Sequence, residues 1–217
     1  MLDGCGREVL APTRPRRIVC LCPSLTETIV VMGAGERLVG RSRYCIHPED
    51  ALLEVDVVGG TKNPDIEAIA ALQPDLIIAE KEENRAEDIA ALEAVAPVYV
   101  FVVEDLEDAF AMLERMAVLL DEQRRGRALA ADVALRWRAL PRLSAPLSCL
   151  YMIWRRPWMA AGRATFIHAV LARLGFENAA LKCTGRYPSL EPEHIRELNP
   201  KLVLLSSEPY PFQARHE

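Results

Sequence analysis

The sequence predicts an α/β fold with two similar Rossmann-like lobes, each built on a parallel sheet. Two observations lead to it. Short apolar runs alternate with helical patterns along the chain, and one helix–proline–strand pattern occurs twice. A long helical stretch lies between the two halves, so we expect the lobes to be joined by a long spine helix.

Five short apolar runs are expected to form buried strands, and several of them are bounded by Pro or Gly. They are residues 18–22, 76–79, 98–102, 147–153 and 202–205.

An internal repeat supports two lobes of like topology. Residues 65–79 (DIEAIAALQPDLIIA) align with residues 191–205 (EPEHIRELNPKLVLL), with five identical positions that include Glu67 with Glu193. In the same order, the strand at 18–22 and a helix ending at Gly33 parallel the strand at 147–153 and a helix ending at Gly175. We expect each glycine to terminate its helix.

The segment between the lobes, residues 105–140, carries two apolar stripes at helical spacing, and Gly126 is a candidate break. Because this segment is helical and amphipathic rather than rich in Gly and Ser, we expect a stiff connection. The expected domains are residues 1–104, a connecting helix at 105–141, and a shortened second lobe at 142–217.

Composition excludes several classes of protein. The net charge of -5 and the pI near 5.5 argue against nucleic-acid binding, which needs a basic surface. No run approaches the roughly 20 apolar residues of a membrane span, and residues 1–12 contain charges where a secretory signal needs an apolar core. The six cysteines are scattered, which favours small buried side chains over a metal site, a disulfide framework or a covalent cofactor.

The segment Pro23-Ser24-Leu25-Thr26-Glu27 has the form of a capping box, which predicts a helix that starts directly after the first strand. In a parallel lobe that helix start lies at the carboxyl edge of the sheet, where ligands bind.

Aromatic and basic side chains follow the first strand of the second lobe, in the segment WRRPWMAAG at residues 154–162. Aromatic faces beside guanidinium groups suit a flat, anionic ligand, so we expect a ligand-binding loop here. Packing of these rings within the protein is the alternative.

The equivalent loop of the first lobe, residues 41–48, is also aromatic and basic, and His47 within it is a candidate metal ligand. A third polar segment, residues 80–85, follows a strand and is either a solvated helix start or a rim of the site. The expected ligand contacts are Arg43, Tyr44, Lys81, Trp154, Arg155, Trp158 and Tyr187.

The order of these elements over residues 16–212 is similar to the cobalamin-binding and ferric-siderophore-binding subunits of import systems, a family described as helical-backbone metal receptors. The resemblance implies a binding protein rather than an enzyme, with a cleft between the lobes. The expected ligand is a metal chelate of the cobalamin, siderophore or haem class, delivered to an ABC transporter permease dimer. It also implies an extracytoplasmic location, and contacts from Glu67 and Glu193 to the permease.

The chain departs from the family in two respects, since no signal peptide is evident and relatives continue beyond the position of residue 217. Two alternatives stay open. One is an intracellular metal-tetrapyrrole chaperone or sensor, and the other is a small α/β enzyme that uses Cys45 and His47.

Overall fold

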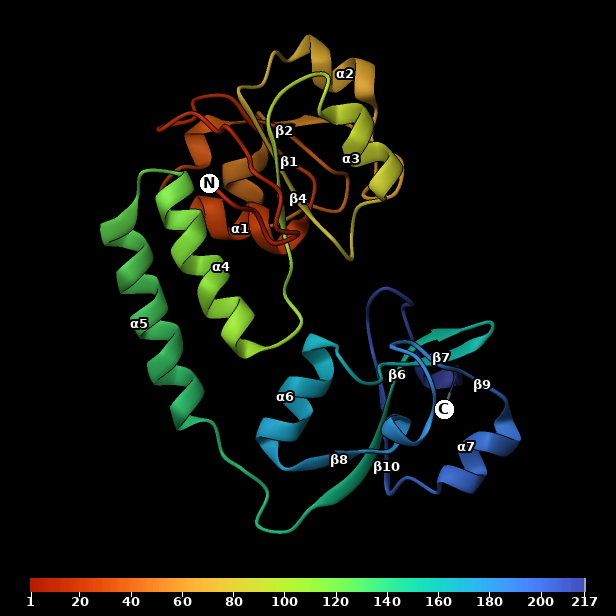
Figure 1. The fold of residues 1–217 in the computed structure, drawn as a ribbon. Helices are drawn as coiled ribbons and strands as arrows, with labels where there is room; N and C mark the ends of the chain where they lie inside the picture. The colour runs from red at the N-terminus through yellow and green to blue at the C-terminus, as the bar shows by residue number, and fades with distance from the viewer. Residues whose placement is uncertain (217) are drawn as a thin grey trace. The chain divides into compact units, whose positions relative to one another are not determined.

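The computed structural model describes residues 1–216 (Figure 1). Its internal contacts divide the chain into two compact units. The N-terminal unit comprises Met1–Val103 and Asp108–Leu135, and the C-terminal unit comprises Glu104–Glu107 and the chain from Arg136 onward.

The N-terminal unit is built on a five-stranded sheet in the order β3-β2-β1-β4-β5, in which every pair of neighbours is parallel. Three of its strands were predicted as apolar runs. The other two, β2 and β3, are short and include polar residues, so no apolar run marked them. The strands are β1 (Ile18–Cys20), β2 (Leu38–Arg41), β3 (Asp56–Val57), β4 (Leu76–Glu80) and β5 (Val98–Phe101).

Helices cover both faces of this sheet, as a parallel sheet requires (Figure 1). Alternate residues of β4 divide between two cores: Ile78 packs with α1 and α4, and Ile77 packs with α2 and α3. The covering helices are α1 (Pro23–Val31), α2 (Ile66–Ala71), α3 (Ala86–Leu92) and α4 (Leu106–Leu119), and two short 3-10 helices are η1 (Gly35–Arg37) and η2 (Glu49–Leu52).

The connecting segment is helical as expected, but it is not one long spine. It forms α4 and a second helix, α5 (Gln123–Ala139), which lie side by side in Figure 1. The chain turns between them at Asp121, whose φ of 57° is left-handed. Gly126 does not break the helix; it permits close packing, because a Cβ there would lie 2.2 Å from Cβ of Ala117. Residues 108–135 group with the N-terminal unit by their contacts, and the connector expected at 105–141 stays a prediction.

The C-terminal unit contains a second five-stranded sheet, in the order β10-β6-β7-β9 with β8 also paired to β6. It is mixed rather than parallel, because β7 runs antiparallel to both β6 and β9. The strands are β6 (Leu147–Arg155), β7 (Trp158–Ala160), β8 (Phe176–Asn178), β9 (Ser189–Leu190) and β10 (Leu202–Leu205).

Helix α7 (Pro192–Leu198) and the 3-10 helix η3 (Ala179–Lys182) pack on the core of this sheet. Helix α6 (Phe166–Leu174) precedes and contacts β8. A last 3-10 helix, η4 (Ala214–His216), lies near the end of the described chain.

Both copies of the repeated pattern fold as predicted. In the first, α2 leads into β4, which pairs in parallel with β1; in the second, α7 leads into β10, which pairs in parallel with β6. Gly33 and Gly175 follow their helices with φ values of 80° and 93°, as glycine in a helix C-cap permits.

Helix α1 starts directly after β1, as expected, but without a capping box. Its N-cap is Cys22, whose side chain makes no capping hydrogen bond, and Pro23 occupies the first turn. The hydroxyl of Thr26 donates instead to the carbonyl oxygen of Cys22, at 2.9 Å. A proline at the first helical position already supplies a helical φ, so the helix begins earlier than the Ser-x-x-Glu pattern indicated.

Candidate functional site

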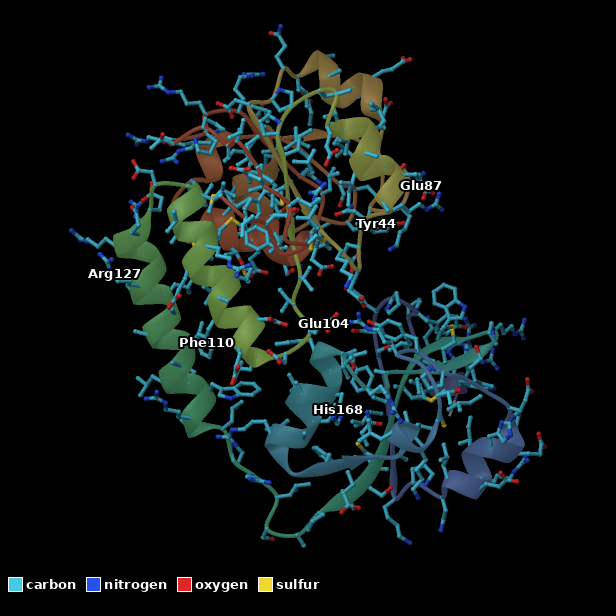
Figure 2. The ribbon with its side chains drawn as sticks, viewed as in Figure 1. Tyr44, Glu87, Glu104, Phe110, Arg127 and His168 are labelled. Atoms are coloured by element: carbon cyan, nitrogen blue, oxygen red, sulfur yellow. The ribbon has the colours of Figure 1, made fainter. Side chains whose placement is uncertain are left out.

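The loops that follow the parallel strands of the N-terminal unit all lie at the carboxyl edge of its sheet. Arg43 and Tyr44 follow β2, and Lys81 follows β4. All three are exposed, and the side chain of Tyr44 lies at the periphery of the unit in Figure 2. The structure therefore places these three predicted residues at the edge where parallel α/β folds bind ligands.

Cys45, beside Tyr44, is buried rather than exposed. Its sulfur lies 3.2 Å from the hydroxyl of Thr26 on α1 and 3.1 Å from that of Ser42. Its carbonyl oxygen accepts from the guanidinium of Arg41, at 3.0 Å. Cys45 thus fixes the loop that presents Tyr44, and its burial argues against the alternative of an enzyme that uses Cys45 and His47.

The thiols of Cys20 and Cys22 are also buried in the core around α1, as predicted for small apolar side chains. Burial raises the pKa of Cys22 to about 12. A thiol with such a pKa stays protonated at neutral pH, so it is a poor nucleophile and metal ligand.

His47 is exposed and lines an open cavity of about 370 Å³ together with Arg41 and Glu49. Among residues 1–216, no three His, Cys, Asp or Glu side chains are grouped so that they hold a metal ion. The described residues therefore offer no complete protein metal site. A role for His47 as a metal ligand stays a prediction.

The aromatic segment of the C-terminal unit is a β-hairpin rather than the expected loop. Strand β6 continues through Arg155, and the chain turns at Arg156 and Pro157 into β7. Arg155 and Trp158 are paired across the hairpin, and the guanidinium lies 5.6 Å from the centroid of the ring. The long apolar run of β6 indicated the strand, but it did not show where the strand ends.

The two tryptophans contact aromatic side chains near the end of the chain, which the sequence did not indicate as part of the site. Trp154 packs edge-on against Tyr210 with centroids 5.5 Å apart, and Trp158 stacks on Phe212 at 6.1 Å. Trp158 is partly buried against the core of the unit, whereas Trp154 remains 39% exposed. Trp154 is therefore the more accessible of the two rings for a ligand.

Tyr187 is separated from this hairpin tip along the sheet. It precedes β9, which pairs with β7 so that Leu190 lies opposite Trp158. The guanidinium of Arg186 lies 5.9 Å from the ring centroid of Tyr187, and it forms an ion pair with Glu104 at 2.8 Å. Tyr187 is exposed, so it stays a candidate contact.

Glu67 and Glu193 occupy the first turns of α2 and α7, and both are exposed. The side chain of Asp65 caps α2 by accepting from the backbone N–H of Ala68. A hydrogen bond from its own backbone N–H and another from Arg196 lower the pKa of Glu193. Both glutamates are therefore available on the surface of their units, as a docking role requires.

Comparison with known proteins finds similar chains among proteins named for binding vitamin B12 or heme. A curated vitamin B12-binding protein of Vibrio campbellii is 26% identical over 195 residues, covering 88% of this chain and 70% of that protein. Among solved structures, a periplasmic heme-binding protein of Roseiflexus sp. RS-1 is 26% identical with a TM-score of 0.79, covering 88% of this chain and 76% of that one. The periplasmic vitamin B12 binding protein of Vibrio cholerae, at 24% identity, shares the fold with a TM-score of 0.75 over 90% of this chain and 78% of that one.

These relatives are named as binding proteins, which confirms both the expected resemblance and the prediction that the chain is not an enzyme. None of the helices within residues 1–216 is both long and apolar enough to cross a membrane. The match of residues 18–214 to the family model described as "Periplasmic binding protein" shows that this chain belongs to the periplasmic binding protein family.

Proposed function

We propose that this chain is the extracytoplasmic substrate-binding subunit of an ABC importer, and that its substrate is a metal tetrapyrrole of the cobalamin or haem class. The observation that carries the proposal is the aromatic and basic lining of the β6–β7 hairpin. In this hairpin the indole of Trp154 is 39% exposed, and the guanidinium of Arg155, the next residue, lies over the indole of Trp158. Indole faces stack on flat macrocycles, and guanidinium groups bind carboxylates and phosphates.

The loops of the N-terminal unit carry exposed side chains of the same chemistry. Tyr44, 57% exposed, stands next to Arg43, and Lys81 lies on the loop that follows β4. Relatives of similar identity named for vitamin B12 or heme support the tetrapyrrole class over the ferric siderophores.

A titration panel tests the substrate class. The protein is titrated with cyanocobalamin, hemin and ferrichrome, and tryptophan emission and ligand absorbance are followed together. We expect saturable one-to-one binding of cyanocobalamin or hemin with quenching of tryptophan emission. Saturable binding of ferrichrome alone, or of none of the three, contradicts the proposal.

We further propose that Glu67 and Glu193 dock the subunit onto a permease dimer. Both are exposed carboxylates at corresponding positions of the repeat, on the first turns of α2 and α7. Because charges at the rim of an interface mainly affect association with the partner, changing them leaves a separate ligand site almost unaffected.

The docking role is tested by charge reversal. Glu67→Lys combined with Glu193→Lys should abolish uptake in a transport assay while ligand affinity stays within about threefold of the parent. Glu87→Lys with Glu177→Lys is the matched control, because these are also exposed carboxylates, one in each unit. Normal uptake by the first pair, or equal loss in the control, refutes the docking role.

A further inference from the structure

Three loops at the carboxyl edge of the N-terminal sheet are linked to one another by hydrogen bonds. They follow β2, β3 and β4 and comprise residues 42–48, 58–65 and 81–85. The first carries Tyr44 and the third carries Lys81, two of the proposed ligand contacts. The loop between them, 58–65, contacts both.

Asn84 joins the loop after β4 to the loop after β3. Its side chain is buried, with the residue only 4% exposed. The oxygen Oδ1 accepts from the backbone N–H of Glu80 at 2.9 Å, and the nitrogen Nδ2 donates to the carbonyl oxygen of Thr61 at 2.9 Å. One amide side chain therefore closes its own turn and holds the neighbouring loop. The ammonium of Lys62 adds a second link by donating to the carbonyl oxygen of Glu82.

Glu80, the last residue of β4, shapes the same turn with its carboxylate. Its oxygen Oε2 accepts from the backbone N–H groups of Glu82 and Glu83, at 2.6 and 3.1 Å. Glu80 is only 7% exposed, and its other oxygen, Oε1, has no hydrogen-bond partner among the described residues. A buried carboxylate is costly, so its retention at this point needs a reason.

The loop after β3 is joined in turn to the loop that carries Tyr44. The backbone N–H of Arg43 donates to the carbonyl oxygen of Gly59 at 2.8 Å. Atom Cε2 of Tyr44 lies 3.5 Å from the point that a Cβ of Gly60 would occupy, so the ring packs on the backbone of this loop. The links from Glu80 and Asn84 therefore reach Tyr44 through Thr61, Gly60 and Gly59.

We propose that Glu80 and Asn84 are positioning residues for the ligand, which hold the loops of Lys81 and Tyr44 in their binding arrangement before the ligand arrives. This inference rests on the proposed function, in which those two loops contact the substrate. Loops that are ordered in advance lose less conformational entropy when the ligand binds, and this smaller cost raises the affinity. The side chains of Lys81 and Tyr44 stay in the binding arrangement only if the contacts that support their loops hold.

The test uses three variants and one control. Asn84→Ala removes both hydrogen bonds of the amide, and Glu80→Leu removes the acceptor of the turn. Glu80→Gln is the conservative variant, because its amide oxygen still accepts from the two N–H groups. Glu87→Gln, an exposed carboxylate just beyond the same loop, is the control. Far-UV circular dichroism confirms that each variant is folded.

Hydrogen exchange of residues 59–64 and 80–85 measures the positioning role without any ligand. We expect Asn84→Ala to accelerate exchange in both segments, including residues 59–64, which are distant from Asn84 in sequence. Glu80→Leu should accelerate exchange in residues 80–85, and Glu80→Gln and the control should resemble the parent. Unchanged exchange of residues 59–64 in Asn84→Ala overturns the inference.

Titration with hemin and cyanocobalamin then measures the effect on binding. Asn84→Ala and Glu80→Leu should each lower the affinity for the ligand that the parent binds by about tenfold, which corresponds to the entropic cost of immobilising about one side chain. Glu80→Gln should bind with the affinity of the parent. If Glu80→Gln binds the ligand as weakly as Glu80→Leu does, Glu80 acts through its charge, and the positioning role is wrong. If the parent binds neither probe, the proposed function fails, and the exchange experiment alone decides whether Glu80 and Asn84 order these loops.

Discussion

The two copies of the helix–proline–strand pattern differ in how deeply they are buried. Strand β4 lies between β1 and β5, and all five of its residues are buried. Strand β10 has the same place in the repeat, but it pairs only with β6, and Val203 on it is 44% exposed. The difference shows that a local pattern determines which element forms, whereas burial depends on the neighbours that the rest of the chain supplies.

The same contrast extends to the two units. Two core clusters on opposite faces of the sheet occupy the N-terminal unit, and one small cluster occupies the C-terminal unit. Because buried apolar area is the main source of stability, we expect substitutions to cost more in the first unit than in the second.

The largest effect is expected from the matched pair Ile77→Ala and Val203→Ala, which the repeat aligns. Ile77 is fully buried, so its truncation should destabilise the N-terminal unit by about 2–5 kcal/mol. Val203 is 44% exposed, so its truncation should cost much less, about 0.5 kcal/mol.

Urea unfolding measures both changes. Circular dichroism follows the whole chain, and tryptophan emission follows the C-terminal unit, because Trp137, Trp154 and Trp158 all lie there. If the two substitutions lower the free energy of unfolding equally, β10 is as buried as β4, and the proposed difference between the two strands is wrong.

A second, smaller effect is expected at the two glycines that end corresponding helices. Gly33→Ala and Gly175→Ala should each cost roughly 1–2 kcal/mol, since both glycines have left-handed φ values. A Cβ on Gly175 would also lie 3.2 Å from Cβ of Leu143. Gly185→Ala isolates the backbone strain, because it has a φ of 89° and no atom within 4 Å of its Cβ position. Urea unfolding should rank Gly175→Ala above Gly185→Ala; the reverse order would exclude the packing contribution.

The smallest effect is expected at Glu80, the last residue of β4, and at Ser206, which directly follows β10; both are buried. Burial raises the pKa of Glu80. Its protonated form is therefore favoured in the folded state, and the stability it contributes at low pH is lost as pH rises through its folded-state pKa.

Glu80→Gln should consequently stabilise the protein at neutral pH, and the gain should vanish below the ordinary glutamate pKa. Ser206→Ala is the control, because a hydroxyl does not titrate in this range. Urea unfolding from pH 4 to pH 8 gives the comparison. A gain that is independent of pH would show that the pKa of Glu80 is not raised.

Much of the fold could be predicted because buried strands of a parallel sheet are continuous apolar runs. The strands β1, β4 and β5 are of this kind. The strands β6 and β10 are also apolar runs, although they belong to a mixed sheet and β10 is only partly buried. The short strands β3 and β7 were missed because two or three residues give no periodicity. The break at Asp121 was missed because a non-glycine residue in a left-handed turn leaves no signal in composition.

The candidate site was predictable only in part. Exposed aromatic and basic residues such as Tyr44 and Trp154 were noticeable because such side chains are costly to leave on a surface. Asn84 was not, since a buried amide is recognised only by its partners, and Thr61 is distant in sequence. The contacts of Tyr210 and Phe212 with the hairpin were missed for the same reason.

The most direct test of the proposed function is a titration of Trp154→Ala with the tetrapyrrole that the parent binds. Truncating a stacking aromatic ring typically removes on the order of 1–3 kcal/mol of binding, so affinity should fall about tenfold to a hundredfold. Trp137→Phe, on α5, is the matched control and should bind like the parent. Parent-like affinity in Trp154→Ala, with the fold intact, would contradict the assignment of the β6–β7 hairpin as a wall of the binding site.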